Sequence, residues 1–448
     1  MSVYTSIVSN IVFPLQERLK RHTTLAVRRS LEQTQWWTPQ QLQQLQLQRL
    51  QALLKNAENR VPYYQHLFRE LRFSADTVQS LADLRRLPFL TKPLIREHLD
   101  ALKADGAVGL APCSTGGSSG EPLRFLIPLE RVSHDVAAKW RATRWWNVDI
   151  GDREIVLWGS PIELGGQGRV KLLRDMLMRT KLLPAFAMSE AKLDEFIGEI
   201  RAFRPRMLFG YPSALAYLAQ HAKKRGIRLD DLGIEVAFVT AEKLYDEQRE
   251  QIEQGFACRV ANGYGGRDAG FVAHQCPDGG AHLTAEDIIV EIIGSDDQPV
   301  PIGESGEIVV THLATADFPF IRYRTGDLGV LDPNPCSCGR GLPLLKEVQG
   351  RKNDFVKALD GTVMHGAALT YILRDLPGIK AFKVIQHSLQ RTEVLLVVDE
   401  EFPTDGDSRI QADFRSRLGQ AVEVDITRHP KLDPEKSGKY RFVMSKIT

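Results

Sequence analysis

The chain has 448 residues, a length that predicts more than one domain. Hydrophobic residues make up 43% and charged residues 25%, which are the proportions of an ordinary globular protein with a large core. The formal net charge of +2 argues against a nucleic-acid binder held by bulk electrostatics. It leaves room for a local basic pocket that binds a small polyanion.

Cysteine content and hydropathy narrow the class further. Five cysteines in so long a chain are too few for a disulfide framework, so we expect a reduced, cytoplasmic protein. No stretch reaches the apolar length of a membrane span. Residues 1–22 contain a short apolar patch without a small-residue cleavage site, and we interpret them as a peripheral helix rather than a signal peptide.

The first strongly periodic segment is 39–58, where leucines recur at helical spacing and glutamines fill the other face. This pattern predicts a surface helix docked on the core, because it lasts too few heptads for a coiled coil. Short β-rich runs then alternate with helical stretches, which favours an α/β domain with buried parallel strands. The expected strands are 154–159, 206–210, 234–240 and 258–265.

The pattern changes twice more along the chain. From residue 284 two β-rich runs, 287–294 and 306–313, flank a turn-rich segment and predict an antiparallel β layer. After "GRKNDF" the last hundred or so residues read as strand, strand, helix and strand. The predicted segments are 381–386, 393–400, 408–420 and 422–429.

These patterns predict an α/β protein of two domains. The large N-terminal domain, 1–349, would combine mixed α/β layers with the β layer. The small C-terminal domain, 350–448, would be a mobile α+β unit.

Residues 113–120, "CSTGGSSG", pack glycines together with hydroxyl residues. Glycines adopt positive φ and leave backbone N–H groups unobstructed, so such a loop can form a nest for phosphate oxygens. It is not a Walker loop, because no Lys-Ser/Thr pair follows and Glu121 stands at its end. From composition alone, a plain hairpin loop explains the segment equally well.

Two later turns carry residues suited to a nucleotide. In "NGYGGRDAG", 262–270, Tyr264 is suited to stack on a planar ring and Asp268 to bind Mg²⁺. In "FPFIRYRTGDLG", 318–329, Asp327 sits in a tight turn where a carboxylate can accept two ribose hydroxyls. Taken alone, each segment is better explained by an ordinary turn.

Two segments near the C-terminus add cations. Arg351 in "GRKNDF" is suited to bridge to phosphate or ribose, and Lys439 follows a glycine in "DPEKSGKYRF". Most lysines in such tails are merely solvated.

The order and spacing of these segments are more specific than any one of them. Together they resemble the AMP-forming adenylating superfamily of acyl-CoA synthetases and luciferases. "RVPYYQHLF", "LPFLTKPLIREHL", "FGYPSALAYLA" and "VTAEKLYDEQ" resemble its phenylacetate–CoA ligase branch, which includes polysaccharide-cluster relatives. The resemblance covers nearly the whole chain from about residue 50.

The resemblance implies a two-step reaction. A carboxylate attacks the α-phosphate of ATP, pyrophosphate leaves, and the acyl-adenylate passes to a thiol or an amine. The chemistry depends on positioning and on neutralising phosphate charge. The implied nucleotide-binding residues are Ser114, Thr115, Gly116, Gly117, Ser118, Ser119, Gly120, Thr240, Ala241, Glu242, Tyr264, Gly265, Asp327 and Arg351.

The resemblance also assigns catalytic and metal roles. Lys439 and Arg351 would be catalytic, Asn353 would be the hinge, and Asp268 would bind Mg²⁺ where the family usually has glutamate. The small domain would reorient after adenylation and carry Lys439 away. The aromatic candidates for the acid pocket are Tyr211, Trp140, Trp145, Trp146 and Trp158, and of these we select Tyr211. Core packing explains such aromatic residues more often than a pocket does.

Two departures from the family pattern leave two interpretations. Glu121 replaces a common lysine, and Asp268 is one methylene shorter than the usual glutamate. A catalytically degenerate nucleotide-binding regulatory protein is one interpretation. We favour a working variant, because Lys439, Asp327 and Arg351 are all present and Mg²⁺ supplies positive charge.

A cysteine and histidine set indicates a second metal. Cys276 and His282 lie in one Gly/Pro-rich turn region and Cys336 and Cys338 in another, on either side of the antiparallel layer. Cys₃His is a structural zinc set, since four protein ligands leave no open position. His274 is the alternative fourth ligand, and two unrelated turns are the alternative explanation.

We therefore expect an ATP- and Mg²⁺-dependent ligase that activates an aryl or arylalkyl carboxylic acid and transfers it to CoA, with a structural Zn²⁺. An enzyme that uses a carrier-protein thiol or an amine as acceptor stays an alternative. We expect no nucleic-acid partner and no membrane span, and a homodimer stays open.

Overall fold

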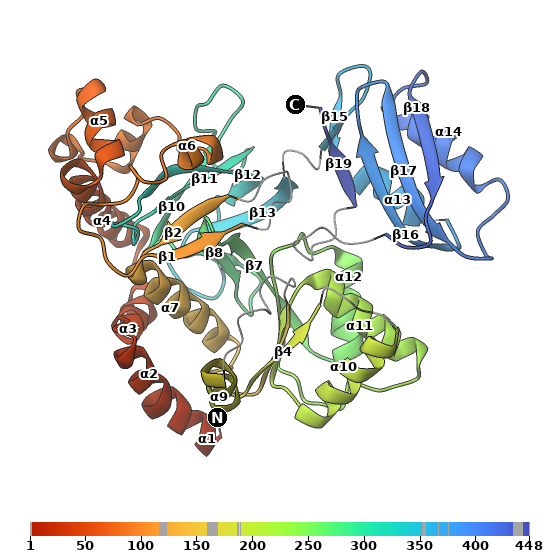
Figure 1. Cartoon of the computed structure of the whole chain (residues 1–448), viewed down its shortest axis with the longest axis horizontal. Coiled ribbons are helices and arrows are strands. Elements are labelled where there is room, and N and C mark those ends of the chain that lie inside the picture. Colours follow the sequence, from red (N-terminus) through yellow and green to blue (C-terminus); the bar gives the residue numbers. More distant parts are fainter. Residues whose placement is uncertain are drawn as a thin grey trace. The chain divides into compact units, whose positions relative to one another are not determined.

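The computed structural model describes residues 2–115, 123–158, 169–185, 188, 190–351, 355–365, 367–374, 376–432 and 442–447. The chain divides into two compact units, Met1–Gln349 and Gly350–Thr448 (Figure 1). Within these described ranges, no helix combines the length and the apolar character needed to cross a bilayer.

Helices occupy the first hundred residues. The longest, α4, starts with a capping box, in which Thr38 Oγ1 accepts from the Gln41 amide at 3.3 Å and Gln41 Oε1 accepts from the Thr38 amide at 2.9 Å. This helix confirms the prediction for 39–58. The elements are α1 (Val3–Ile7), the π-helical η1 (Val8–Val12), α2 (Phe13–Leu19), α3 (Thr24–Thr34), α4 (Pro39–Arg60), α5 (Pro62–Glu70), η2 (Ala75–Thr77), η3 (Leu81–Arg86) and α6 (Lys92–Glu97).

In the described part of the chain, eleven strands form one sheet in the order β10-β11-β12-β13-β9-β8-β7-β6-β5-β3-β4. Their bounds are β3 (Glu154–Trp158), β4 (Thr180–Pro184), β5 (Met207–Gly210), β6 (Val236–Val239), β7 (Arg259–Gly266), β8 (Gly270–Gln275), β9 (Ala281–Leu283), β10 (Ile288–Ile293), β11 (Ser305–His312), β12 (Phe320–Asp332) and β13 (Leu344–Arg351). A separate hairpin pairs β1 (Ala111–Ser114) with β2 (Arg124–Ile127).

The parallel strands expected from the sequence are confirmed as β3, β5, β6 and β7, and the antiparallel pair as β10 and β11. The sequence did not indicate that the two regions form one continuous sheet. They are continuous because β7 pairs in parallel with β6 on one edge and antiparallel with β8 on the other.

Both faces of the parallel strands are buried. In β6, Ala237 and Val239 pack in a cluster with α10, α11 and α12, while Val236 and Phe238 pack with Trp146 after α7. Alternate side chains therefore serve opposite layers, as expected for a doubly covered sheet. The helices of this region are α7 (Leu129–Trp145), α9 (Arg169–Met178), α10 (Glu190–Phe203), α11 (Pro212–Lys224) and α12 (Asp246–Phe256).

The second unit has its own core. Its four-stranded sheet has the order β18-β17-β16-β19, and a two-stranded ladder pairs β14 with β15. The predicted strands and helix are confirmed. The elements are β14 (Phe355–Lys357), β15 (Val363–His365), α13 (Ala367–Arg374), β16 (Ile379–Gln386), β17 (Arg391–Val398), α14 (Gly406–Leu418), β18 (Glu423–Arg428) and β19 (Val443–Ser445).

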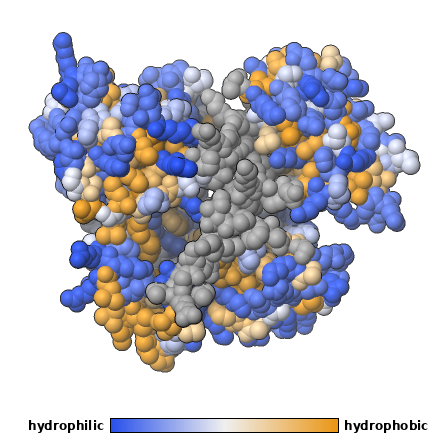
Figure 2. All heavy atoms as spheres, viewed as in Figure 1, coloured by the Kyte–Doolittle hydropathy of each residue, from blue (hydrophilic) through white to orange (hydrophobic). Residues whose placement is uncertain are grey.

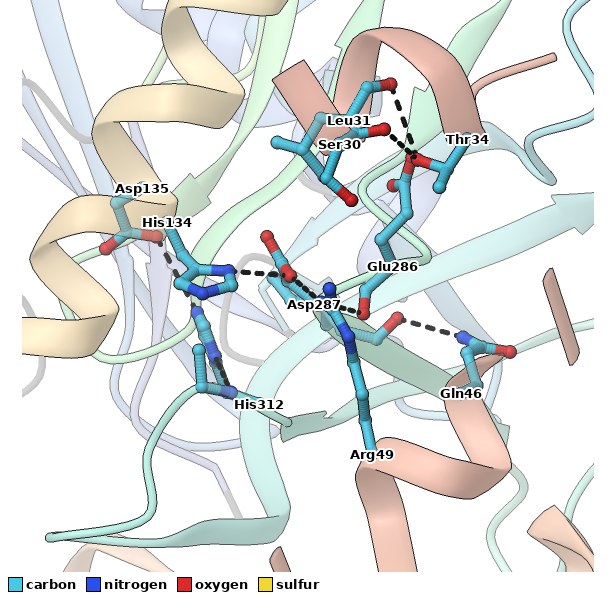
Figure 3. A network of polar contacts seen from close by, with 12 residues as sticks. Ser30, Leu31, Thr34, Gln46, Arg49, His134, Asp135, Glu286, Asp287 and His312 are labelled. Carbon is cyan, nitrogen blue, oxygen red and sulfur yellow. Dashed lines mark hydrogen bonds and ion pairs between the residues drawn. The ribbon is translucent and has the colours of Figure 1, made fainter. Parts of the chain in front are cut away.

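A buried polar network ties the N-terminal helices to the sheet (Figure 3). Glu286, which is 1% exposed, accepts from Thr34 of α3 at 2.7 Å and pairs with Arg141 of α7 at 2.6 Å. The next residue, Asp287, accepts from His134 of α7 at 2.8 Å and pairs with Arg49 of α4 at 2.5 Å. Three helices are therefore joined to the turn that precedes β10.

The network also fixes charge states. Burial alone would lower the pKa of His134, but the adjacent Asp287 carboxylate outweighs burial and the pKa is raised. Burial likewise opposes ionisation of Asp287, yet His134 and Arg49 hold the pKa of this carboxyl well below its ordinary value. Buried charges persist here because each has a partner.

We predict that Glu286→Ala destabilises the first unit by roughly 3–5 kcal/mol, because Arg141 would be left as an unpaired buried cation. Denaturant unfolding followed by tryptophan fluorescence measures this change, since all six tryptophans precede residue 159. The matched control is Glu195→Ala, which removes an exposed pair with Lys192 and should cost about 0.5 kcal/mol or less. Equal losses in the two variants would contradict a structural role for the network.

Candidate active site

The carboxyl ends of the parallel strands gather several of the expected residues at one edge. Tyr211 follows β5 and precedes α11, Thr240 to Glu242 follow β6, and Tyr264 lies near the end of β7. Neighbouring parallel strands end at the same edge of a sheet, which is where open α/β folds bind ligands. Ala241 adopts φ +71°, so the chain turns sharply where it leaves β6.

Tyr264 and Asp327 meet across the sheet. The Tyr264 hydroxyl donates to Asp327 Oδ2 at 2.9 Å, although the residues are 63 positions apart. The Asp327 amide donates to Thr325 Oγ1 at 3.1 Å, which fixes the predicted Thr-Gly-Asp turn. Burial and the Asp327 charge raise the pKa of Tyr264 well above normal, so the phenol stays a neutral donor. An aromatic face thus lies beside a half-buried carboxylate.

Asp268, the expected Mg²⁺ ligand, lies in the turn between β7 and β8. Its Oδ2 accepts from the buried Tyr323 hydroxyl at 2.6 Å. This bond fixes the direction of a carboxylate that is half-buried. A hard cation with oxygen ligands suits such a group, and the residue present fits the expected metal.

The glycine-serine loop is described only at its base. Strands β1 and β2 pair Ser114 with Arg124, and the Thr115 amide donates to the Leu123 carbonyl at 3.0 Å. Leu123 in turn donates its amide to Thr115 Oγ1 at 3.1 Å. Gly116 to Gly120 lie outside the described residues, as does Glu121.

Arg267 is a site residue that the sequence reasoning missed. Its guanidinium donates to the Ser114 carbonyl at 3.2 Å, at the base of the glycine-serine loop. Its own carbonyl accepts from the fully buried Arg131 at 2.5 Å, which holds the turn in place. A cation therefore stands beside the loop, next to Asp268. The sequence signal was a basic residue inside the motif that contains Tyr264 and Asp268.

An aromatic pair lies near this edge, and Tyr211 is the buried member of the pair. Trp158, at the end of β3, stacks on Tyr211 with ring centroids 4.4 Å apart and planes at 20°. The other tryptophans proposed for the pocket belong elsewhere. Trp140 is 2% exposed and contacts Phe13 edge to face, Trp146 is buried under β5 and β6, and Trp145 packs against His282.

Glu242 is oriented by backbone contact, since its Oε2 accepts from the Ser213 amide at 3.3 Å. Gly265 is required by packing, because a Cβ there would lie 2.2 Å from the Gly270 carbonyl oxygen across the β7–β8 turn. Arg351 ends β13, and only its backbone is described. Asn353 and Lys439 lie outside the described residues.

The four expected zinc ligands do come together. Cys276 Sγ lies 3.6 Å from Cys336 Sγ, and Cys338 Sγ lies 3.2 Å from His282 Nε2. All four ligand atoms lie within 4.8 Å of one another. Ligand atoms on a tetrahedral zinc with bonds of about 2.0–2.3 Å stand roughly 3.3–3.8 Å apart, so the donors present fit that ion.

His282, rather than His274, is the histidine of this cluster. His274 instead stacks on Phe271 with ring centroids 5.1 Å apart. Burial lowers the pKa of His282 to about 4 and that of His274 to about 3. Burial also raises the pKa of the Cys276 thiol to about 12. Cys113 and Cys258 lie outside the cluster.

Comparisons with known proteins find relatives over most of the chain. A family described as the CapK C-terminal domain matches residues 357–446. A phenylacetate–coenzyme A ligase of Thermus thermophilus is 26% identical over 409 residues, covering 87% of each chain. Protein CapK of Staphylococcus aureus is 22% identical over 408 residues, covering 90% of this chain and 89% of that one.

A solved structure shares the fold. The 2-hydroxyisobutyryl-CoA ligase in its postadenylation state superimposes with a TM-score of 0.73 at 19% identity, covering 92% of this chain and 91% of that one. The relative that covers 87% of this chain and the shared fold support an AMP-forming ligase of the adenylating superfamily. Within that superfamily, the chain is similar over most of its length to phenylacetate–coenzyme A ligases and to protein CapK.

Proposed function

We propose that this protein activates a carboxylic acid with ATP to form an acyl-adenylate and then transfers the acyl group to CoA, releasing AMP and pyrophosphate. The observation that carries the proposal is the Tyr264–Asp327 contact beside Asp268 and Arg267, at the base of the glycine-serine loop. Relatives that are named phenylacetate–coenzyme A ligase support the use of an acid and of CoA.

The proposed roles follow from the chemistry of each group. The ring of Tyr264 flanks adenine, and Asp327 accepts the ribose hydroxyls while its other oxygen keeps the tyrosine bond. Backbone amides and hydroxyls of residues 114–120 would hold the β- and γ-phosphates. A magnesium ion at Asp268 would offset charge on the phosphates, and Tyr323 keeps that carboxylate aimed.

We propose an aryl or arylalkyl acid as substrate. Trp158 is partly exposed at the carboxyl end of β3, and the buried Tyr211 after the neighbouring strand β5 stacks behind its ring. The Trp158 ring therefore offers a flat apolar surface for an aromatic ring. The free state of the five cysteines favours a reducing compartment, and we place the reaction in the cytoplasm.

The domain roles are part of the same proposal. The first unit, Met1–Gln349, would bind ATP and the acid, and the second, Gly350–Thr448, would bring Lys439 to the α-phosphate around a hinge at Asn353. Lys439 would serve only adenylation and would leave before the thiol arrives.

Pyrophosphate exchange over a panel of carboxylic acids tests the function. We expect exchange to be highest with arylalkyl acids and to be abolished by Lys439→Ala. Transfer to CoA from a supplied acyl-adenylate should be largely retained in that variant.

If none of the acids supported exchange although ATP bound, the protein would instead be a nucleotide-binding regulatory protein. If product formed with an amine or a carrier protein but not with CoA, that compound would be the acceptor in place of CoA. Equal loss of both steps in a folded Lys439→Ala would contradict the assignment of that lysine to adenylation alone.

We predict that Arg267→Ala raises the KM for ATP in the exchange assay by about tenfold or more, because a charge-assisted contact to phosphate is lost. Arg267→Lys keeps the charge and should recover part of the affinity. The matched control is Arg225→Ala, which removes an exposed arginine at the end of α11. An unchanged KM for ATP in Arg267→Ala would exclude a phosphate contact.

We propose further that Cys276, His282, Cys336 and Cys338 hold a structural Zn²⁺. The ion would tie the end of β8 and strand β9 to the turn between β12 and β13. All four positions would be filled by protein ligands, so the ion would stabilise the fold and take no part in the reaction.

Elemental analysis of the purified full chain should find about one zinc per chain, as a four-ligand site requires. The double variant Cys336→Ser, Cys338→Ser should lose the metal and show a lower unfolding temperature. Cys113→Ser removes a thiol outside the cluster and should keep the zinc. A double variant that retained full zinc would rule out this site.

A further inference from the structure

The N-terminal helical segment carries its apolar side chains outward. Val3, Ile7, Ile11, Leu15 and Leu19 recur every four residues, with exposed fractions from 46% at Ile7 to 86% at Leu19. Four residues of α-helix turn about 40° beyond one full turn, so such a row would drift around the helix. The π-helical stretch Val8–Val12 holds more residues per turn and rotates the row back.

The side that faces the protein is polar at Thr5, Ser9 and Glu17 and apolar at Val8 and Phe13. Thr5, Ser9, Phe13 and Glu17 follow the same four-residue spacing and are all buried. Thr5 donates to Asp152 at 2.7 Å, and Glu17 accepts from Thr24 at 2.5 Å. A surface helix normally buries its apolar stripe, whereas here a row of five aliphatic side chains faces outward. Folding of the chain therefore does not explain the outward aliphatic row.

A neighbouring helix widens this surface. The Tyr4 hydroxyl donates to the Leu177 carbonyl at 2.9 Å, which joins α1 to the end of α9. From α9, Leu173, Met176 and Leu177 are 40–67% exposed. We call the exposed set the N-terminal apolar face: Val3, Ile7, Ile11, Leu15, Leu19, Leu173, Met176 and Leu177. Figure 2 shows hydrophobic atoms gathered at the lower left, over α1 and α2.

Cations border the apolar face. Arg18, Lys20 and Arg21 are exposed at the end of α2, and a surface hollow beside Leu15 is lined by Arg18, Arg21 and His22 together with apolar side chains. Glu17 is the one acidic residue within positions 2–31, and it is buried. The exposed surface of this segment thus combines aliphatic groups with positive charge.

We propose that the N-terminal apolar face docks on the surface of an anionic lipid bilayer. Aliphatic side chains would enter the boundary of the acyl chains, and Arg18, Lys20 and Arg21 would contact lipid phosphates. A second copy of the chain fits less well, because a two-fold interface would bring these cations near their own copies. The docking is peripheral, since no described helix can span a bilayer.

Cosedimentation of the purified full chain with lipid vesicles tests the proposal. We expect binding to phosphatidylcholine vesicles that contain phosphatidylglycerol, weaker binding to phosphatidylcholine alone, and a decrease at high salt. The variant Ile7→Gln, Ile11→Gln, Leu15→Gln should lower the partition coefficient more than about tenfold. Ile302→Gln, which replaces an equally exposed aliphatic residue outside the face, should not change it.

Arg18→Gln, Arg21→Gln tests the charge separately and should reduce binding to the anionic vesicles by about tenfold or more. Both residues are exposed, so this variant keeps the test valid if the apolar variant fails to fold. Pyrophosphate exchange by each variant reports an intact enzyme. Absence of binding by the wild type, equal binding to both kinds of vesicle, or a dimer in sedimentation that the apolar variant abolishes would each overturn the proposal.

Discussion

Strand β7 is the constraint on which the site depends, because it is shared by the two halves of the sheet. It runs parallel to β6 and antiparallel to β8, so it belongs to both strand patterns. Its close approach to β8 requires Gly265, where a Cβ would lie 2.2 Å from a carbonyl oxygen. Tyr264 stands at this junction and therefore reaches Asp327 of β12, which lies in the antiparallel half. Without the shared strand, these two residues would belong to separate layers.

The same turn bears on the charge of the glycine-serine loop. The sequence has Glu121 where a lysine is common, which left the source of positive charge open. Arg131 holds the carbonyl of Arg267, and the Arg267 side chain reaches Ser114 at the base of the loop. If the loop binds phosphate as we propose, Arg267 on the turn after β7 would supply positive charge close to its base. In our proposal, Arg267 on the turn after β7 supplies the positive charge that a lysine of the glycine-serine loop commonly supplies.

The residues of the site were more predictable than their contacts. The motif order identified Tyr264, Asp268 and Asp327, but the bonds to Tyr323 and between Tyr264 and Asp327 depend on strand order, which no local pattern encodes. The cysteine and histidine set was predicted from ligand type, and the two turns that flank the antiparallel strands do bring it together. For Trp140 and Trp146 the sequence could not distinguish a pocket residue from a core residue, and both are buried in the core. The four-residue spacing of residues 3–19 likewise indicates two faces but not which one is exposed.

Electrostatics give a physical reason for our proposal that the second unit supplies a cation. Among the site residues placed in the described chain, Glu242, Asp268 and Asp327 are carboxylates, and Arg267 is a guanidinium. A triphosphate adds further negative charge to that edge, so its binding requires cations that arrive with it or after it. Magnesium accompanies the nucleotide, and in our proposal Lys439 comes from the second unit. A lysine fixed permanently at the α-phosphate would also catalyse the reverse reaction, in which pyrophosphate attacks the adenylate and re-forms ATP and the acid. A cation that is present for one step and absent for the next meets both requirements, which is the physical reason to place it on a separate unit.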